Sequence, residues 1–173
     1  MYAVTAPKTS ADLWMLSLSG DRKSSPLLHA PFVESHGQIS PDGKWLAYFS
    51  NETGRTEVYV QSFPAEKGGR WQVSTNGGFT PKWSKDGKEL FYLSPDNQIM
   101  SSQVRLVPTF EANAAKPLFA IHPFAVPRIA GGYMDTFAPA PDGQHFAVHA
   151  PLYSSRDITV VLNWPLLLNQ KSH

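Results

Sequence analysis

Short runs of apolar, β-branched and aromatic residues recur along the chain, and turn-forming residues separate them. The clearest pattern is an apolar run on each side of an Asp-Gly pair, at Asp42-Gly43, Asp86-Gly87 and Asp142-Gly143. Glycine tolerates the positive φ of a tight turn, and aspartate can hydrogen-bond the turn backbone, so each pair predicts a β-hairpin. No stretch shows a sustained 3.6-residue apolar period with caps. The pattern therefore predicts an all-β domain with little or no helix.

The hairpin segments form an internal repeat. Three stretches align with one another: 39–49, 83–93 and 138–148. Their Asp-Gly pairs are 44 and 56 residues apart, and a four-stranded propeller blade takes ~40–50 residues. A third and a fourth strand-like run follow each of the first two hairpins. These runs are 57–63 with 70–74, and 98–104 with 116–120.

The two ends of the chain are unequal pieces of the same repeat. Residues 12–18 match the third-strand pattern and residues 25–29 the fourth, so the chain begins in the outer half of a blade, which suggests a fragment. At the other end, residues 134–139 and 144–150 supply the first two strands, and 157–162 the third. The predicted division is 1–30 (outer strands of a split blade), 31–76 (blade), 77–122 (blade) and 123–173 (final incomplete blade), a partial β-propeller of about three four-stranded blades.

Composition and charge limit the classes of function and partner that we expect for this chain. The chain is 42% apolar and 12% aromatic, which is a globular composition. Fifteen Lys and Arg against 14 Asp and Glu give a net charge of +1, so a nucleic-acid partner is not expected. There is no cysteine, which excludes disulfides and thiolate sites but does not fix the compartment. No segment reads as a signal peptide or as a membrane span of about 20 apolar residues.

The first hairpin, from Ser40 to Tyr48, resembles the TolB-like propeller repeat almost letter for letter, because that repeat carries a Ser-Pro-Asp-Gly-(Lys/Arg)-x-(Leu/Ile)-Ala-Tyr hairpin. The stretches 57–64, 71–78, 86–93 and 158–164 are more closely similar to the propeller that follows the kinase and membrane segments of some bacterial serine/threonine protein kinases. The resemblance implies a six-bladed ring outside the cytoplasm, in the periplasm or beyond, that senses or binds proteins. None of the kinase motifs occurs in this chain.

A partial ring predicts self-association. Three blades leave two open sheet edges and uncovered apolar faces, which a soluble protein must cover. Two copies in head-to-tail contact about a two-fold axis would close a six-bladed ring, with the opening strands of each copy completing the last blade of the other. One difficulty is that residues 157–162 compete with residues 12–18 for the third-strand place.

Candidate chemistry lies where the first strands line the central channel, because the loops that enter these strands converge at its mouth. No hydrolase elbow, phosphate-binding loop or His-Glu-x-x-His motif is present. We expect a non-catalytic module that needs no cofactor and binds a protein, peptide or small molecule at this mouth. The candidate binding residues are Glu34, Ser35, His36, Gln38, Thr80, Lys82, Asp135 and Thr136.

The alternative is a metal-dependent hydrolase for esters, lactones or phosphotriesters. Glu34, His36 and Asp135 would hold Zn²⁺ or Ca²⁺ on the propeller axis or act as acid and base. His145 and His149 do not form a second site, because residues i and i+4 of a strand lie about 13 Å apart. The repeated aromatic residues at Trp14, Trp45, Trp71, Trp83, Tyr48, Phe91 and Tyr92 are interpreted as core layers between blades.

Overall fold

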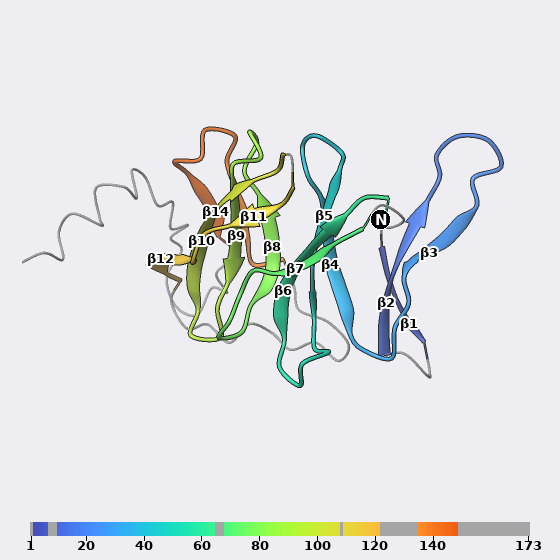
Figure 1. Cartoon of the computed structure of the whole chain (residues 1–173), viewed down its shortest axis with the longest axis horizontal. Helices are drawn as coiled ribbons and strands as arrows, with labels where there is room; N and C mark the ends of the chain where they lie inside the picture. Colours follow the sequence, from blue (N-terminus) through green and yellow to red (C-terminus); the bar gives the residue numbers. More distant parts are fainter. Residues whose placement is uncertain (1, 7–9, 65–67, 108, 122–134, 149–173) are drawn as a thin grey trace, which may run out of the picture.

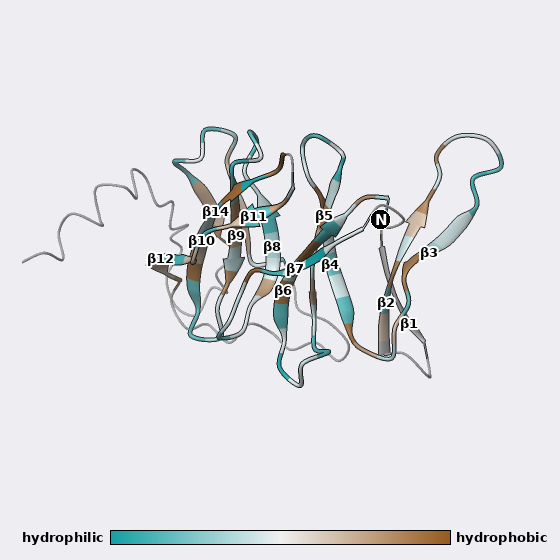
Figure 2. Ribbon diagram, in the orientation of Figure 1, coloured by the Kyte–Doolittle hydropathy of each residue, from teal (hydrophilic) through white to brown (hydrophobic). Residues whose placement is uncertain are grey.

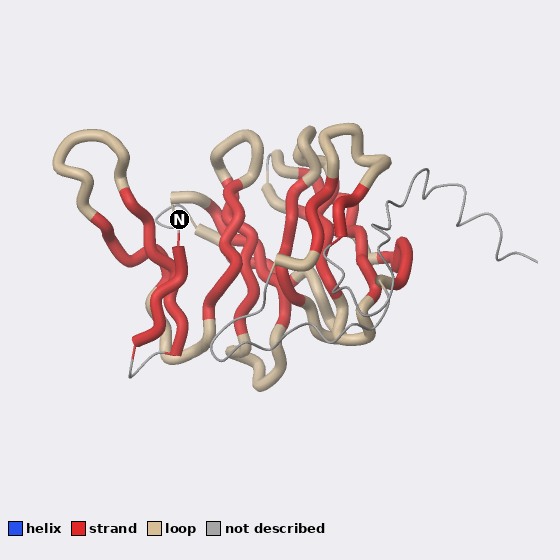
Figure 3. The backbone as a smooth tube through the Cα atoms, turned by 180° about the vertical axis from the view of Figure 1, so that it is seen from behind, coloured by secondary structure: helices blue, strands red, loops and turns tan. Residues whose placement is uncertain are grey.

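The computed structural model describes residues 2–6, 10–64, 68–107, 109–121 and 135–148. Within these ranges the chain forms antiparallel strands and turns and no helix, so it offers no helix that could cross a membrane. Figure 3 shows strands and loops only. The all-β prediction is confirmed.

Four sheets stand side by side in chain order, as Figure 1 shows. The first blade contains β1 (Tyr2–Ala6), β2 (Ser10–Leu16) and β3 (Ser24–Leu28). The second contains β4 (Glu34–Ile39), β5 (Trp45–Ser50), β6 (Glu57–Ser62) and β7 (Arg70–Gln72). The third contains β8 (Phe79–Trp83), β9 (Glu89–Leu93), β10 (Gln98–Arg105), β11 (Glu111–Ala112) and β12 (Lys116–Ala120). The last piece is the hairpin β13 (Phe137–Pro139) and β14 (Phe146–Val148).

These sheets match the predicted repeat with two additions. The second blade has four strands in the order first to fourth, the third blade has the same four with β11 as a fifth strand, and β13–β14 begin another blade. The sequence analysis missed β1, which pairs with β2 along Tyr2–Ala6, and β11, a short strand beside β10. The predicted strand at 157–162 lies outside the described residues.

The cores lie between neighbouring blades, as expected for sheets that pack face to face. The first and second blades share Leu13, Leu46, Tyr48 and Tyr59. Large aromatic side chains, among them Trp45, Trp83 and Phe110, fill the joint between the second and third blades. The joint beyond it is built from Phe91, Leu93, Ile99, Leu118, Phe137 and Phe146. Figure 2 shows hydrophobic colour in parts of many strands, polar colour in parts of others such as β4 and β8, and polar colour in many of the turns.

A buried carboxylate lies at or near the start of the third strand in each of the first two blades. Glu57 begins β6 and accepts hydrogen bonds from the Ser74 hydroxyl, from the Gly77 amide at 3.0 Å and from the Arg55 guanidinium at 2.8 Å. Asp12 takes the equivalent place on β2 and is bonded at 2.8 Å to Nδ1 of His29, which follows β3 as Ser74 follows β7. In each blade this bond ties the end of the outermost strand to the third strand.

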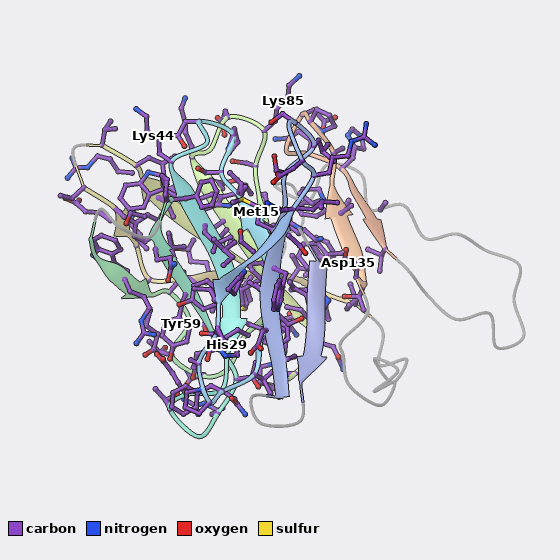
Figure 4. All side chains as sticks on the ribbon, turned by 90° about the vertical axis from the view of Figure 1, so that its right-hand side faces the viewer. Met15, His29, Lys44, Tyr59, Lys85 and Asp135 are labelled. Carbon is purple, nitrogen blue, oxygen red and sulfur yellow. The ribbon has the colours of Figure 1, made fainter. Side chains whose placement is uncertain are left out.

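The three Asp-Gly hairpins have one turn geometry. Gly43, Gly87 and Gly143 have φ of 72°, 71° and 66°, and each amide bonds the carbonyl three residues earlier. We call the end of the molecule that carries these turns the hairpin end. The opposite end, where loops lead into the inner strands, is the loop end. In Figure 4, Lys44 and Lys85 project at the hairpin end and His29 lies toward the loop end.

Valine at these turns should be destabilising, and by unequal amounts. Gly43→Val should lower the free energy of unfolding by about 1 kcal/mol or more, because a β-branched residue resists positive φ. Gly87→Val should cost more, since a Cβ there would lie 3.3 Å from Leu106 Cδ1 and 3.6 Å from Pro41 Cδ, whereas Gly43 has open space. Gly43→Asn should cost least of the three, because asparagine tolerates this conformation. Thermal melts compare them, and unchanged melting temperatures in both valine variants would contradict this turn geometry.

High pH should weaken the fold through two buried tyrosines. Burial raises the pKa of Tyr48 and of Tyr92 to about 12, and for Tyr92 the nearby Glu57 carboxylate adds to the effect. A raised pKa means that stability is fully present below the unfolded value near 10 and is lost as pH rises toward 12. Each tyrosine should then remove about 1.4 kcal/mol per pH unit in that window. Urea titrations at pH 9, 10 and 11 measure this slope, and Tyr92→Phe should reduce it; an identical slope in that variant would refute the assignment.

Candidate functional site

Three candidate residues occupy the same position in consecutive blades. His36, Thr80 and Thr136 each lie four residues before the residue that opens the hairpin turn, which is Ser40, Ser84 or Ala140. His36 and Thr80 have φ of 54° and 46°, in the left-handed region that residues with a Cβ seldom adopt. At both places the register with the second strand shifts, between Ser35 and Gln38 and between Phe79 and Lys82. The inner strands therefore carry a bulge that turns a side chain at one fixed point of the repeat.

The side chains at this point differ in their surroundings. Thr80 and Thr136 are buried, with exposed fractions of 1% and 4%, and neither Oγ1 has a hydrogen-bond partner within the described ranges. His36 is half-buried; its ring stacks on Phe49 with centroids 5.2 Å apart, and its Nδ1 lies 3.0 Å from the Ser35 hydroxyl. Unpartnered buried hydroxyls cost free energy unless water or a ligand bonds them. The hydroxyls of Thr80 and Thr136, in adjacent blades, can therefore still bond water or a ligand.

An ion pair joins two of the inner strands. Lys82 Nζ lies 2.7 Å from Asp135 Oδ1, although the two residues are 53 positions apart in sequence. The Lys82 side chain is 12% exposed and that of Asp135 is 61% exposed, so the pair has one covered and one open partner. A second link across blades runs from Trp83 Nε1 to the Gln38 carbonyl oxygen at 3.0 Å. The structure thereby brings together Lys82 and Asp135, and gives the Gln38 backbone a structural role.

Glu34 belongs to a different environment from Asp135. It is buried at the start of β4, and its Oε2 accepts the Ala30 amide at 3.3 Å. Burial raises the pKa of this carboxyl; Asp12 and Glu52 raise it further, while the Ala30 amide and Arg70 act in the opposite direction. Glu34 thus faces the joint between the first and second blades, and Asp135 faces Lys82.

The metal alternative required Glu34, His36 and Asp135 to converge. In the part of the chain that the structure describes, no three His, Asp or Glu side chains are placed so that they could hold a metal ion. The carboxylate of Glu34 is bonded to the Ala30 amide and that of Asp135 to Lys82. These three residues do not form a ligand set in this arrangement. His145 forms its own contact with Asp142 at 2.5 Å, and His149 lies outside the described residues.

Sequence reasoning did not find a groove of about 870 Å³ at the hairpin end. It runs between the turns of the third blade and of the last hairpin. Hydrogen bonds from the Lys88 amide and the Ser84 hydroxyl lower the pKa of Asp86, and bonds from the Gln144 amide and His145 lower that of Asp142. Both carboxylates are therefore bonded within their own turns. No sequence signal predicts the groove, because its walls come from separate blades. Its lining includes Lys85, Lys88, Glu89, Gln103, Pro141 and Gln144.

Solved structures of other proteins share features of the fold of this chain. No family model matches the chain, and no curated protein matches it. Among solved structures, a putative TolB from Agrobacterium tumefaciens matches with a TM-score of 0.51 and 16% identity, over 64% of this chain and 41% of its own length. TolB from Acinetobacter baumannii matches with a TM-score of 0.47 and 18% identity, over 93% of this chain and 51% of its own. An oligogalacturonate lyase from Vibrio parahaemolyticus gives 0.48 and 12%, over 78% and 35%.

The described region has the fold of a partial β-propeller, similar to that of the Agrobacterium TolB structure. The Agrobacterium structure and the blade order of this chain agree on that fold. The chain spans about a third to a half of the length of these structures. The TolB-like resemblance and the partial-propeller prediction are therefore confirmed at the level of fold, and the domain boundaries remain predictions.

Proposed function

We propose that the chain is a non-catalytic propeller module that binds a protein, peptide or small ligand at the mouth of its channel. The observation that supports this most directly is the bulged inner strand at His36 and Thr80, with a third polar residue, Thr136, at the matching place of the next blade. Residues in the left-handed region cost of order 1–3 kcal/mol and cluster at functional sites. The Lys82–Asp135 pair holds two of these strands in a fixed relation and leaves Asp135 open to a ligand.

The chemistry at this mouth is that of recognition. It offers an imidazole, hydroxyls, an ammonium and one open carboxylate, which together can bond a polar backbone or a zwitterionic ligand. In the described part of the chain no three His, Asp or Glu side chains could hold a metal ion together, and Glu34 and Asp135 of the hydrolase alternative bond different partners. Binding therefore accounts for the arrangement better than hydrolysis does.

Selection from a displayed random-peptide library tests the binding proposal. Peptides selected on the wild-type chain should lose at least about tenfold in affinity, or 1.4 kcal/mol, for the triple variant His36→Ala, Lys82→Met, Asp135→Asn. The matched control, Lys44→Ala with Lys85→Ala at the opposite end, should bind as the wild type does. Equal binding to the triple variant would remove the channel mouth as the site.

Metal analysis and turnover assays test the rival function. Purified protein should contain no stoichiometric Zn²⁺ or Ca²⁺ and should show no chelator-sensitive hydrolysis of ester, lactone or phosphotriester substrates. About one equivalent of metal, with activity lost on chelation and in His36→Ala, would replace the binding proposal by the hydrolase.

The ends of the arc support self-association as a homodimer. Met15, Leu16 and Leu18 on the first blade are 37%, 43% and 82% exposed, and exposed apolar groups at a blade end favour burial against a partner. The strand β1 alters the predicted ring closure, however. It takes the second-strand place, as β14 does, so the opening strands of one copy can complete the last blade of another only if β1 or β14 is displaced.

Light scattering after gel filtration measures the assembly. At micromolar concentration we expect a mass twice the chain weight of 19.1 kDa, because a dimer can bury the apolar end of the first blade. Leu16→Arg should shift the mass toward the monomer, and Val107→Arg should leave it unaltered, since Val107 is an exposed apolar residue of the third blade, 62% exposed against 43% for Leu16. A wild-type mass near that of one chain would exclude the dimer.

A further inference from the structure

The ion pair at the channel mouth is asymmetric in its exposure. Lys82 Nζ lies 2.7 Å from Asp135 Oδ1, but the Lys82 side chain is 12% exposed and the Asp135 side chain is 61% exposed. Solvent therefore reaches mainly the negative partner. Figure 4 shows Asp135 on the side of the molecule away from Tyr59, which belongs to the third strand β6. A ligand at the mouth thus meets a carboxylate whose position Lys82 fixes.

The Asp135 carboxylate retains capacity for a second bond. An ionised carboxylate has about four acceptor sites on its two oxygens, and in the described part of the chain this one is bonded only through Oδ1, to Lys82. Oδ2 is therefore open to a donor from a ligand. The other carboxylate among the candidate residues does not compete for that donor, because Glu34 is 4% exposed and its Oε2 accepts the Ala30 amide.

We propose that the ligand at the channel mouth carries a basic group, an ammonium or a guanidinium, that donates a hydrogen bond to Oδ2 of Asp135. This inference rests on the proposed binding function and names the chemistry of its ligand. The carboxylate then bridges two cations, Lys82 and the basic group of the ligand. Hydrogen bonds between ionised groups are about twice as strong as those between neutral groups. The contact therefore selects a basic ligand over a neutral one of the same shape.

An acidic ligand fits this site less well. Lys82 is the one lysine or arginine among the candidate residues, and its ammonium is covered and already paired. A carboxylate or phosphate could reach Lys82 only by displacing Asp135, and until then it would face a charge of its own sign. The exposed partner of the ion pair thus decides which sign of charge the mouth accepts.

A double-mutant cycle with peptides selected on the wild-type chain tests the basic group. The selected sequences should be enriched in lysine or arginine. Replacing that lysine by norleucine, or that arginine by citrulline, removes the charge and keeps most of the shape. It should weaken binding at least about fivefold, a size suited to a partly exposed contact. In Asp135→Asn the same replacement should change binding less than about twofold, because the charged acceptor is gone.

Asp21→Asn is the matched control for the change in the protein. The Asp21 side chain is 60% exposed and also pairs with a lysine, Lys23, but on the first blade. This variant should leave the effect of the peptide replacement unaltered. The replacement itself is made in the peptide, so its effect on wild-type binding can be measured whether or not Asp135→Asn folds.

Each other result overturns the inference. Binders without a basic residue, or an equal loss in the wild type and in Asp135→Asn, would remove the basic group and leave the binding function intact. Binders enriched in aspartate or glutamate that bind Asp135→Asn more tightly would assign the site to an acidic ligand held by Lys82. Failure to select any peptide that the triple variant loses would remove the binding function at the mouth, and this inference with it.

Discussion

Phe91→Ala should lower the free energy of unfolding by about 4 kcal/mol, the largest effect expected from any single change described here. The Phe91 side chain lies on β9 with no exposed surface. It meets Phe146 edge-to-face, with ring centroids 5.1 Å apart and planes at 88°. Alanine would leave a cavity in the joint that holds the last hairpin against the third blade, and the surroundings can close only part of it.

Urea unfolding measures this loss, and two variants calibrate it. Phe91→Leu keeps most of the volume and should cost less than about 1.5 kcal/mol. Phe32→Ala removes a ring that is 37% exposed and should also cost much less. Hydrogen exchange at residues 146–148 should quicken selectively in Phe91→Ala. A loss under about 1 kcal/mol would mean that the hairpin does not depend on this contact.

Glu57→Ala should lower the free energy of unfolding by about 3 kcal/mol. The Glu57 carboxylate is buried and accepts hydrogen bonds from the Ser74 hydroxyl, from the Arg55 guanidinium and from the Gly77 amide, which lies within reach of both carboxylate oxygens. Removing it leaves the Ser74 hydroxyl and the Gly77 amide without their acceptor, and an unsatisfied buried donor costs about 1–3 kcal/mol. The loop from Ser74 to Gly77 should then lose its attachment to β6.

A matched charge on the surface separates this effect from simple loss of an ion pair. Glu111 pairs with Arg105, but both side chains are more than half exposed. Glu111→Ala should therefore cost under about 0.5 kcal/mol in the same urea experiment. Equal losses for Glu57→Ala and Glu111→Ala would show that the buried network contributes nothing beyond a surface pair.

The hairpins were predictable because their signals are local. Asp42-Gly43 and Asp86-Gly87 lie within turns whose bonds close over a few residues, so residue type alone indicates the geometry. The third and fourth strands followed from turn residues and alternating apolar positions. β1 was not predicted because Tyr2–Ala6 is not preceded by the Asp-Gly turn that marks the other second strands, although it shares an Ala-Val pair with residues 146–150.

The site was only partly predictable, because its pairings depend on how the blades stack. Lys82 and Asp135 were both candidates, but they are 53 positions apart and nothing in the sequence between them indicates that they meet. The raised pKa of Glu34 was equally hidden, since burial is its main cause and the charges of Asp12, Glu52 and Arg70, from three other segments, also act on it. The bulges at His36 and Thr80 are positive-φ positions held by non-glycine residues, which residue type does not reveal.

Each hairpin turn of the second and third blades is self-contained. Ser40 donates to Asp42 at 2.5 Å and accepts the Trp45 amide at 3.0 Å, and Ser84 makes the same bonds to Asp86 and Glu89 at 2.8 and 2.9 Å. A stretch of gene that encodes such a hairpin brings all the bonds of its turn when it is duplicated, and only the faces between blades must be refitted. Mutation can therefore diversify the inner strand of each copy, as at His36, Thr80 and Thr136, while the turn beside it is inherited intact.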